Sequence, residues 1–356
     1  MKLLIAGGGT GGHVFPAIAV AREWKARKKD REVVLVGTER GIEMKLAPLA
    51  GLPLETIRAA GLKGMGGTRL LKNAAMLLPA MMDSAAILRR HRCAAAFGVG
   101  GYASGPMMLA AALRRVPMVI FEPNAEPGLA NRMLARLADR IATAHRSTAE
   151  QWGAKAVVTG CPIRKEFFNV PAREHRAPFH ILITGGSQGA NAVNRAVAQA
   201  AGKFAERKGE LRFVHQSGER DYNEVREAYA QQGLHAEVVP FIQNMAERFA
   251  QADLIVCRSG AITVAEISAA GKAAILVPFA GATDAHQLRN AEVMQQAGAA
   301  RLLPQAELTP KRLAAEIFSL LDQPEQLTRM EQAARGHSHP HAAEEIVNLI
   351  EGVARA

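Results

Sequence analysis

The strongest constraint on this chain is a pattern that occurs twice. Residues 2–13 read KLLIAGGGTGGH, and residues 180–191 read HILITGGSQGAN. Each is a short apolar run that ends in a glycine-rich turn and leads into a pattern typical of a helix. A strand, a tight glycine turn and a helix start together present backbone N–H groups to phosphate. The repetition predicts two similar α/β nucleotide-fold domains that face one another across a cleft.

With 356 residues, 49% of them hydrophobic, the chain is long enough for two domains with substantial cores. Its three cysteines are too few and too scattered for a disulfide framework or a paired-Cys metal site. We expect the first strand at residue 2 and hence no signal peptide, and no apolar run is long enough to span a membrane. These observations predict a cytosolic protein that is either free or held on a membrane surface.

Positive charge is concentrated in the first half of the chain. Residues 1–165 carry 25 Lys and Arg against 11 Asp and Glu, and residues 166–356 carry 19 against 22, so the net charges are +14 and −3. This asymmetry indicates contact with a membrane, a nucleic acid or a phosphorylated substrate, and a solvated basic face without a partner is the alternative. Because aromatic residues make up only 5% and do not alternate with the basic ones, we expect no nucleic acid partner.

Apolar runs and helical patterns alternate in both halves, which predicts parallel sheets covered on both faces. Strands are expected at residues 2–6, 32–36, 94–99, 117–121, 156–159, 180–184, 211–214, 236–239, 253–257 and 273–277. Helices are expected at residues 14–28, 69–91, 104–114, 127–138, 190–201, 221–231, 261–270 and 285–297, and throughout the chain after residue 310. We expect a first domain over residues 1–160, a linker over 161–178 and a second domain over 179–340. A final helix within 341–356 is expected to pack back on the first domain.

The first glycine turn satisfies G-x-G-x-x-G through Gly7, Gly9 and Gly12. It predicts either a dinucleotide site with Glu39 as the acidic ribose ligand, or a turn that lets an anion or a hydroxyl approach the main chain closely. His13 follows the turn directly, and an imidazole has a pKa suited to accepting a proton near neutral pH. In the alternative interpretation, His13 only caps or packs against the following helix.

Three polar segments of the second half also follow expected strands. Ser187, in GGSQG, is suited to a phosphate oxygen, with a helix N-cap as the alternative. Glu266, in RSGAITVAE, is suited to a ribose diol, but with Thr263 it also matches an S/T-x-x-E capping box, and the motif alone leaves the two interpretations even. Gln287 and Asn290, in DAHQLRNA, can bind sugar hydroxyls or form an ordinary polar first turn.

Two further turns of the first half follow strands. The segment GVGGYASGP carries Tyr102 and Ser104, which we expect to be exposed, and Asn124 ends the next strand. Because open α/β sheets bind ligands at the carboxyl ends of their strands, we expect these three residues near a ligand.

An apolar stripe at helical spacing runs through residues 70–88 and is surrounded by Lys and Arg. Such a stripe is more often core, but the glycine-rich segment 61–67 before it favours a surface that contacts lipid. His337, His339 and His341 alternate in what we expect to be a solvated loop. No Asp-x-Asp and no G-x-x-x-x-G-K-[ST] motif occurs, so we expect no bound metal, no P-loop and no cofactor.

Seven motifs occur in the order found in the MurG family, which the chain resembles. This family comprises the UDP-N-acetylglucosamine transferases that convert lipid I into lipid II in peptidoglycan synthesis. The motifs are GGGTGGH, GTERGIE, GVGGYASGP, PIR at 162–164, GGSQGA, RSGAITVAE and DAHQLRNA, within residues 7–291. The resemblance implies the GT-B architecture, with two Rossmann-like α/β domains and the donor mainly in the second. It also implies a peripheral protein on the cytoplasmic face of the cell membrane.

The resemblance further implies roles for individual residues. Near the donor and the acceptor diphosphate would lie Thr10, Gly11 and Gly12. UDP-N-acetylglucosamine would contact Asn124, Arg164 and Ser187, and the main chain at Ile242 would read the uracil edge. The phosphate and ribose would be lined by Ala261, Ile262, Thr263, Val264, Ala265 and Glu266, with Glu266 on the ribose hydroxyls. Gln287 would hold sugar hydroxyls, and Pro123 stands where the family usually has Gln.

These observations lead to a mechanistic hypothesis. The 4-hydroxyl of lipid-linked N-acetylmuramic acid would displace UDP at the anomeric carbon, with inversion from α to β and with His13 as the base. Helix N-termini and Arg164 would stabilise the departing diphosphate. The rival hypotheses are a UDP-N-acetylglucosamine epimerase of the same architecture, a nicotinamide-dependent dehydrogenase and a nucleic acid binder.

Overall fold

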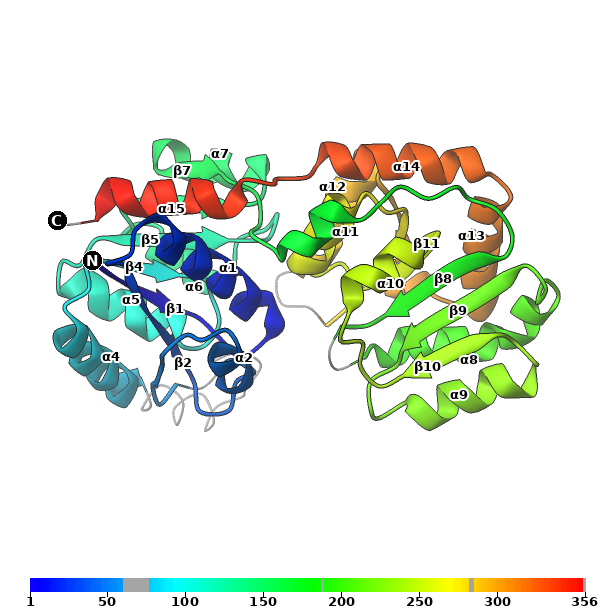
Figure 1. Ribbon diagram of the computed structural model, residues 1–356, viewed down its shortest axis with the longest axis horizontal. Coiled ribbons are helices and arrows are strands. Elements are labelled where there is room, and N and C mark those ends of the chain that lie inside the picture. Colours follow the sequence, from blue (N-terminus) through cyan, green and yellow to red (C-terminus); the bar gives the residue numbers. More distant parts are fainter. Residues whose placement is uncertain (60–76, 187–188, 282–284, 355–356) are drawn as a thin grey trace. The chain divides into compact units, whose positions relative to one another are not determined.

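The computed structural model describes residues 1–59, 77–186, 189–281 and 285–354, and they form two compact units (Figure 1). The first unit comprises Met1–Ile163 together with His339–Ala356, and the second comprises Arg164–Ser338. The expected linker, residues 161–178, is thus divided between the units, since it belongs to the second unit from Arg164 onward. Among the residues that are described, no helix is both long and apolar enough to cross a membrane.

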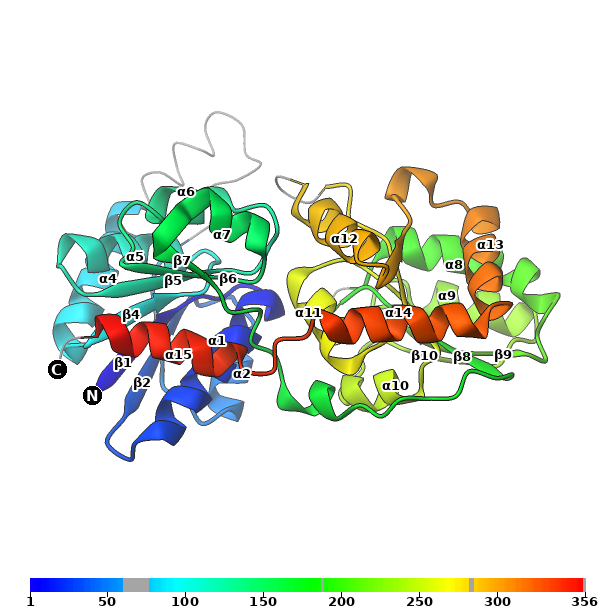
Figure 2. The same ribbon diagram turned by 90° about the horizontal axis from the view of Figure 1, so that it is seen from above.

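The first unit contains a seven-stranded parallel sheet in the order β3-β2-β1-β4-β5-β6-β7. Its strands are β1 (Lys2–Ala6), β2 (Glu32–Gly37), β3 (Leu54–Thr56), β4 (Ala95–Gly98), β5 (Met118–Glu122), β6 (Arg140–Thr143) and β7 (Ala156–Val158). Its helices are α1 (Gly11–Arg27), α2 (Glu43–Leu49), α4 (Leu77–His91), α5 (Ser104–Leu113), α6 (Leu129–Leu134), α7 (Arg146–Trp152) and α15 (Ala342–Val353). Helices α1 and α15 cover one face, and α4 and α5 cover the other (Figure 2).

Helix α15 is fastened to this unit by Arg27, at the end of α1. The Arg27 guanidinium donates to the Asn348 side chain at 2.7 Å and to the carbonyl oxygen of Glu344 at 2.9 Å, and it pairs with Glu351 at 2.8 Å. Beneath these polar contacts, Ile346 and Ile350 are fully buried. The last helix of the chain therefore completes the hydrophobic core of the first unit.

The second unit contains a six-stranded parallel sheet in the order β10-β9-β8-β11-β12-β13. Its strands are β8 (Phe179–Thr184), β9 (Leu211–Gln216), β10 (Ala236–Val239), β11 (Leu254–Cys257), β12 (Ala274–Leu276) and β13 (Ala300–Leu302). Its helices are α8 (Asn191–Ala205), α9 (Tyr222–Gln231), α10 (Met245–Gln251), α11 (Ala261–Ala270), α12 (His286–Gln296), α13 (Pro310–Leu321) and α14 (Pro324–Gly336).

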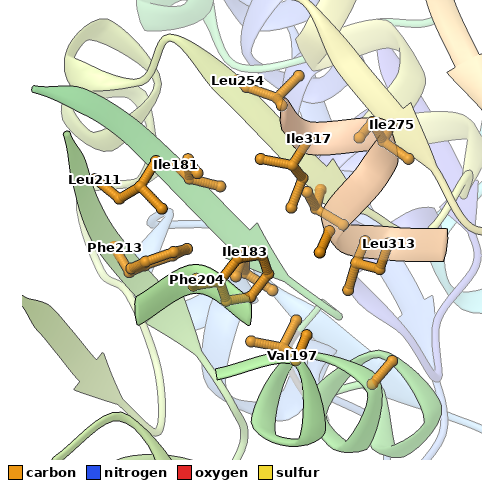
Figure 3. Close-up of a cluster of buried hydrophobic side chains, with 14 of the residues drawn as sticks. Ile181, Ile183, Val197, Phe204, Leu211, Phe213, Leu254, Ile275, Leu313 and Ile317 are labelled. Atoms are coloured by element: carbon orange, nitrogen blue, oxygen red, sulfur yellow. The ribbon is translucent and has the colours of Figure 1, made fainter. Parts of the chain in front are cut away.

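One large core of the second unit lies between its sheet and the helices α8, α9 and α13 (Figure 3). Ile181 and Ile183 of β8 point into it, and Val197 and Phe204 of α8 meet them from the helix side. The spacing of these residues follows from the geometry of strands and helices. Alternate residues of a strand share one face, and so does every third or fourth residue of a helix. Burial of such side chains is the main favourable contribution to folding.

All ten predicted strands are present, and the described part of the chain contains three further strands and three further short α-helices. The additional elements are β3, β6, β13, α2, α7 and α10. The added strands have only three or four residues, too few for an alternating pattern to be recognised, and the added helices have seven residues each. The helix expected at residues 69–91 is observed from Leu77 onward, and its earlier part lies outside the described residues.

Candidate functional site

The order of the first sheet reverses between β1 and β4, and the loops after these strands form the first candidate site. The backbone N–H of Val99 donates to the carbonyl oxygen of Ala6 at 2.9 Å, so the strand pairing continues into the loops. A Cβ on Gly101 would overlap the carbonyl oxygen of Gly8, so only glycine permits this approach. Open α/β sheets bind ligands at such a reversal, outside the carboxyl ends of the strands.

Helix α1 begins in the first of these loops. Thr10 is its exposed N-cap residue, and within the described part of the chain its side chain makes no capping hydrogen bond. Gly11 and Gly12 are the first two residues of the helix, and both are half-buried. The first backbone N–H groups of a helix have no carbonyl oxygen within the helix to which they can donate. These three predicted residues therefore lie together at a helix start suited to an anion.

His13 follows on the same helical turn and is half-buried. Its Nδ1 lies 2.9 Å from the carbonyl oxygen of Val99. Because a carbonyl only accepts, Nδ1 carries the proton and the neutral ring keeps its lone pair on Nε2. Burial lowers the pKa of His13, and the hydrogen bond to Val99 opposes the shift. The imidazole is therefore neutral at neutral pH, as a general base must be.

Glu43, at the start of α2, is a residue of this loop system that the sequence analysis did not single out. Its carboxylate accepts from the backbone N–H of Gly9 and from that of Thr38, both at 2.8 Å, and the residue is 2% exposed. The signal was present, since Glu43 ends the motif GTERGIE. The dinucleotide interpretation of the first glycine turn had instead named Glu39, whose side chain is exposed.

The other predicted residues of the first unit differ in exposure. Tyr102 is 57% exposed, as expected. The prediction that Ser104 is exposed is wrong: α5 begins at this residue and buries it against Gly98, leaving it 1% exposed. Asn124 is half-buried, and its backbone N–H and Nδ2 both donate to Oε1 of Glu122. Glu122, which the sequence analysis also missed, therefore orients the Asn124 side chain.

The second sheet reverses between β8 and β11, and this reversal is the second candidate site. After β8, Gly189 has a φ of 72°, and a Cβ on it would overlap the carbonyl oxygen of Ser217. The glycine turn therefore packs directly on the loop after β9. Ser187, the predicted phosphate ligand in this turn, lies outside the described residues.

After β11, helix α11 begins at Ala261 with Gly260 as its N-cap residue. The alternative interpretation of Thr263 and Glu266 as a capping box is therefore wrong, because Thr263 stands within the first turn rather than at the N-cap. The backbone N–H groups of residues 261–263, in the first turn of the helix, have no intrahelical acceptor. Exposure alternates along the turn: Ala261, Thr263 and Ala265 are half-buried, and Ile262 and Val264 are buried.

Glu266, on the same helix, is paired with Arg164. Nη2 of Arg164 donates to Oε1 of Glu266 at 2.8 Å. Burial raises the pKa of Glu266, while the guanidinium opposes this shift. The guanidinium carbon also lies 4.7 Å from the centre of the Phe167 ring. The structure thus brings two predicted donor ligands together as one ion pair.

Ile242 follows β10, and its backbone N–H already has a partner. It donates to Oε1 of Gln216 at 2.9 Å, while Nε2 of Gln216 donates to the carbonyl oxygen of Gly186 at 2.6 Å. A nucleobase could use the Ile242 N–H only by displacing Gln216, which the sequence analysis missed. A pocket of about 460 Å³ beside Ile242 is lined in part by Phe241, which is 57% exposed.

The two predicted residues of α12 have different environments. Gln287 is half-buried, and its Oε1 accepts from the backbone N–H of Phe279 at 3.0 Å. Asn290 is 0% exposed, and its Nδ2 donates to the carbonyl oxygen of Ser259 at 3.2 Å. The expectation that Asn290 reaches a sugar is therefore corrected: it is an internal support for the loop before α11.

Comparison with known proteins covers nearly the whole chain. The glycosyltransferase family 28 N-terminal domain matches residues 3–143, and the glycosyltransferase family 28 C-terminal domain matches residues 180–346. A relative from Pelobacter propionicus, named UDP-N-acetylglucosamine–N-acetylmuramyl-(pentapeptide) pyrophosphoryl-undecaprenol N-acetylglucosamine transferase, is 43% identical over 98% of this chain and 99% of its own.

Two solved structures are also similar. The crystal structure of Acinetobacter baumannii MurG has a TM-score of 0.81 and 32% identity, and the match covers 99% of each chain. A UDP-N-acetylglucosamine 2-epimerase from Neisseria meningitidis has a TM-score of 0.71 at 14% identity and covers 99% of this chain and 100% of its own. At that low identity, the epimerase demonstrates a shared fold alone.

Proposed function

Because this chain belongs to glycosyltransferase family 28 and has its two-domain GT-B fold, we propose that it transfers N-acetylglucosamine from UDP-N-acetylglucosamine to lipid I. The acceptor is the 4-hydroxyl of undecaprenyl-diphospho-N-acetylmuramoyl-pentapeptide, and the product is lipid II. The observation that carries the proposal is the near-full-length similarity to the Pelobacter propionicus relative, whose name states this transfer.

The second unit binds the donor in this proposal. The start of α11 offers backbone N–H groups to the diphosphate. Glu266, oriented by Arg164, accepts from the ribose hydroxyls. Phe241 receives the uracil, the main chain at Ile242 reads the uracil edge once Gln216 is displaced, and Gln287 holds sugar hydroxyls. The ion pair between Arg164 and Glu266 supports this assignment, because it holds the carboxylate in place without a ligand.

The first unit binds the acceptor and supplies the base. Nε2 of His13 accepts the proton of the 4-hydroxyl as that oxygen forms a bond to the anomeric carbon of N-acetylglucosamine. The bond from that carbon to the phosphate oxygen breaks, and UDP leaves with the electron pair. Attack opposite the leaving group inverts the α-linked donor to a β-linked product. Thr10, Gly11 and Gly12 bind the acceptor diphosphate at the start of α1.

We also propose that the first unit docks on the anionic cytoplasmic face of the cell membrane. Leu78 and Met82 of α4 are 72% and 70% exposed, and Arg89 is exposed at the other end of the helix. Exposed apolar residues on a helix that also carries exposed basic residues fit a surface of anionic lipid. The matched test compares liposome binding by Leu78→Ser with Leu49→Ser, since Leu49 is an exposed leucine of α2. Binding of the wild-type protein to the liposomes should weaken as the salt concentration rises. It should also be weaker in Leu78→Ser, but not in Leu49→Ser. Binding that does not depend on salt would contradict the electrostatic part of this proposal.

The transfer is tested by measuring UDP release from UDP-N-acetylglucosamine with and without a lipid I analogue. We expect release that depends on the acceptor, together with a β-linked disaccharide. Donor turnover without an acceptor would instead indicate an epimerase or a hydrolase. Tight donor binding without any transfer would mean that the acceptor is misassigned, and binding of a nicotinamide cofactor would favour the dehydrogenase.

A further inference from the structure

The side chain of Glu43 fills a space that three glycines leave open. A Cβ on Gly8, Gly37 or Gly41 would overlap the Glu43 side chain. These glycines belong to three segments: the loop after β1, the end of β2 and the turn before α2. Three separate segments therefore lack side chains where this one carboxylate lies.

The donors around this carboxylate are neutral. Oε2 accepts from the backbone N–H of Gly9, and Oε1 accepts from the backbone N–H of Thr38 at 2.8 Å and from its hydroxyl at 3.1 Å. No Lys or Arg forms an ion pair with Glu43 among the residues described. A buried carboxylate must be compensated by hydrogen bonds or by an ion pair. Hydrogen bonds to an ionised group are stronger than hydrogen bonds between neutral groups. The amides of two loops thus converge on an anion that belongs to the protein itself.

We propose that Glu43 is a positioning residue that serves as an internal anion for the first glycine loop. In glycine loops of Rossmann folds, backbone amides bind the phosphate of a ligand. Here the Gly9 amide is already occupied, so it is withheld from a dinucleotide pyrophosphate. Phosphate is directed instead to the amides of Gly11 and Gly12, and the same bond holds the loop that leads to His13. The assignment of that phosphate to the acceptor rests on the proposed function.

Two substitutions separate the effect of charge from that of volume. Glu43→Gln keeps the volume, but its amide NH₂ must face the N–H of Gly9 or Thr38, where a donor meets a donor. Glu43→Ala empties the space and leaves three donors around it. Glu39→Ala is the matched control, since Glu39 is an exposed carboxylate of the same motif.

In acceptor-dependent UDP release, we expect both Glu43 variants to lower kcat about 10–10²-fold through misplacement of the loop. The KM for UDP-N-acetylglucosamine should stay unchanged, because the donor binds the other unit. The Glu39→Ala enzyme should resemble wild type. Wild-type kcat in both Glu43 variants would overturn the proposal, and so would an increased donor KM with unchanged kcat.

A second measurement does not depend on activity. Formate or acetate should occupy the empty space in Glu43→Ala and raise its thermal midpoint, whereas chloride at equal ionic strength should not. Wild type, Glu43→Gln and Glu39→Ala should show no specific response. Equal responses to chloride and carboxylate would overturn the internal-anion assignment. If wild type shows no acceptor-dependent transfer, the proposed function fails, while this titration still decides the role of Glu43.

Discussion

The guanidinium of Arg164 and the carboxylate of Glu266 lie 2.8 Å apart although 102 residues separate them in the chain. Arg164 is the first residue of the second unit, and Glu266 lies on α11. The pair joins the entry of the unit to the helix that follows β11. It therefore links the stability of this unit to the geometry of the candidate donor site.

Replacing Arg164 by Ala should destabilise the protein by about 1–3 kcal/mol, because Glu266 loses the partner of a largely buried carboxylate. The pKa of Glu266, already raised by burial, should rise further without the guanidinium. Urea unfolding measures the stability. Glu166→Ala is the control, since Glu166 is exposed and 3.9 Å from Nε of Arg164. Strict additivity in the Arg164→Ala/Glu266→Ala double variant would show that the pair contributes nothing.

Replacing His13 by Ala should lower kcat by about 10²–10⁴-fold if Nε2 accepts the hydroxyl proton. Because burial lowers the pKa of His13 from 6.5, its neutral form persists below that pH. The acid limb of the wild-type kcat profile should therefore lie below pH 6.5 and disappear in the variant. His337→Ala, at an exposed histidine of α14's end, is the control. Near-normal turnover by His13→Ala would remove the base assignment.

His175 should make stability fall at alkaline pH. Its Nδ1 lies 2.9 Å from Asp253 and its Nε2 lies 3.3 Å from Glu331, and although burial opposes the shift, these carboxylates raise its pKa to about 9. A raised pKa stabilises the fold fully below pH 6.5, and this contribution is lost as pH rises towards 9. The loss should be on the order of 2–3 kcal/mol.

Unfolding by urea at pH 6, 7.5 and 9 measures this effect, with His175→Gln as the comparison. The variant should be less stable than wild type at pH 6 and approach it at pH 9. Parallel pH dependences of the two proteins would contradict the assignment.

Gly189→Ala should destabilise the second unit by about 3 kcal/mol or more, since it combines a positive φ with overlap of the Ser217 carbonyl. Gly233→Ala is the matched control: its φ is 62°, and a Cβ there would have no atom within 4 Å. The control should cost only about 1–2 kcal/mol, the strain of a left-handed residue. Equal losses of thermal stability in the two variants would mean that the contact with Ser217 does not matter.

Local patterns were sufficient for much of the architecture. The runs that became β1 and β8 are continuous apolar segments followed by glycines, and both the strand period and the turn chemistry act over a few residues. The short strands β3 and β13 were missed because edge strands of three residues carry no readable period. Their pairing with β2 and β12 forms them.

For the candidate site too, the environment of some residues followed from a local pattern, and that of others did not. Thr10 and Tyr102 lie in the loops that follow β1 and β4, and Tyr102 is exposed as the motif predicted. Ser104 and Asn290 are polar residues in turn-like or helix-start patterns, but neighbouring segments bury them. Burial depends on what packs from elsewhere in the chain, which a local pattern does not contain.

The sequence by itself determined that there are two parallel sheets, each with a strand that leads into a glycine-rich turn. It also determined the family and the residues that follow the strands, because those signals are local and occur in a fixed order. Only the tertiary structure decided which polar groups meet. Glu43 bonds Gly9 across 34 positions, and Arg164 bonds Glu266 across 102. Such partners are selected by the space and the unsatisfied donors that folding brings together, and those exist only after the sheets and helices have packed.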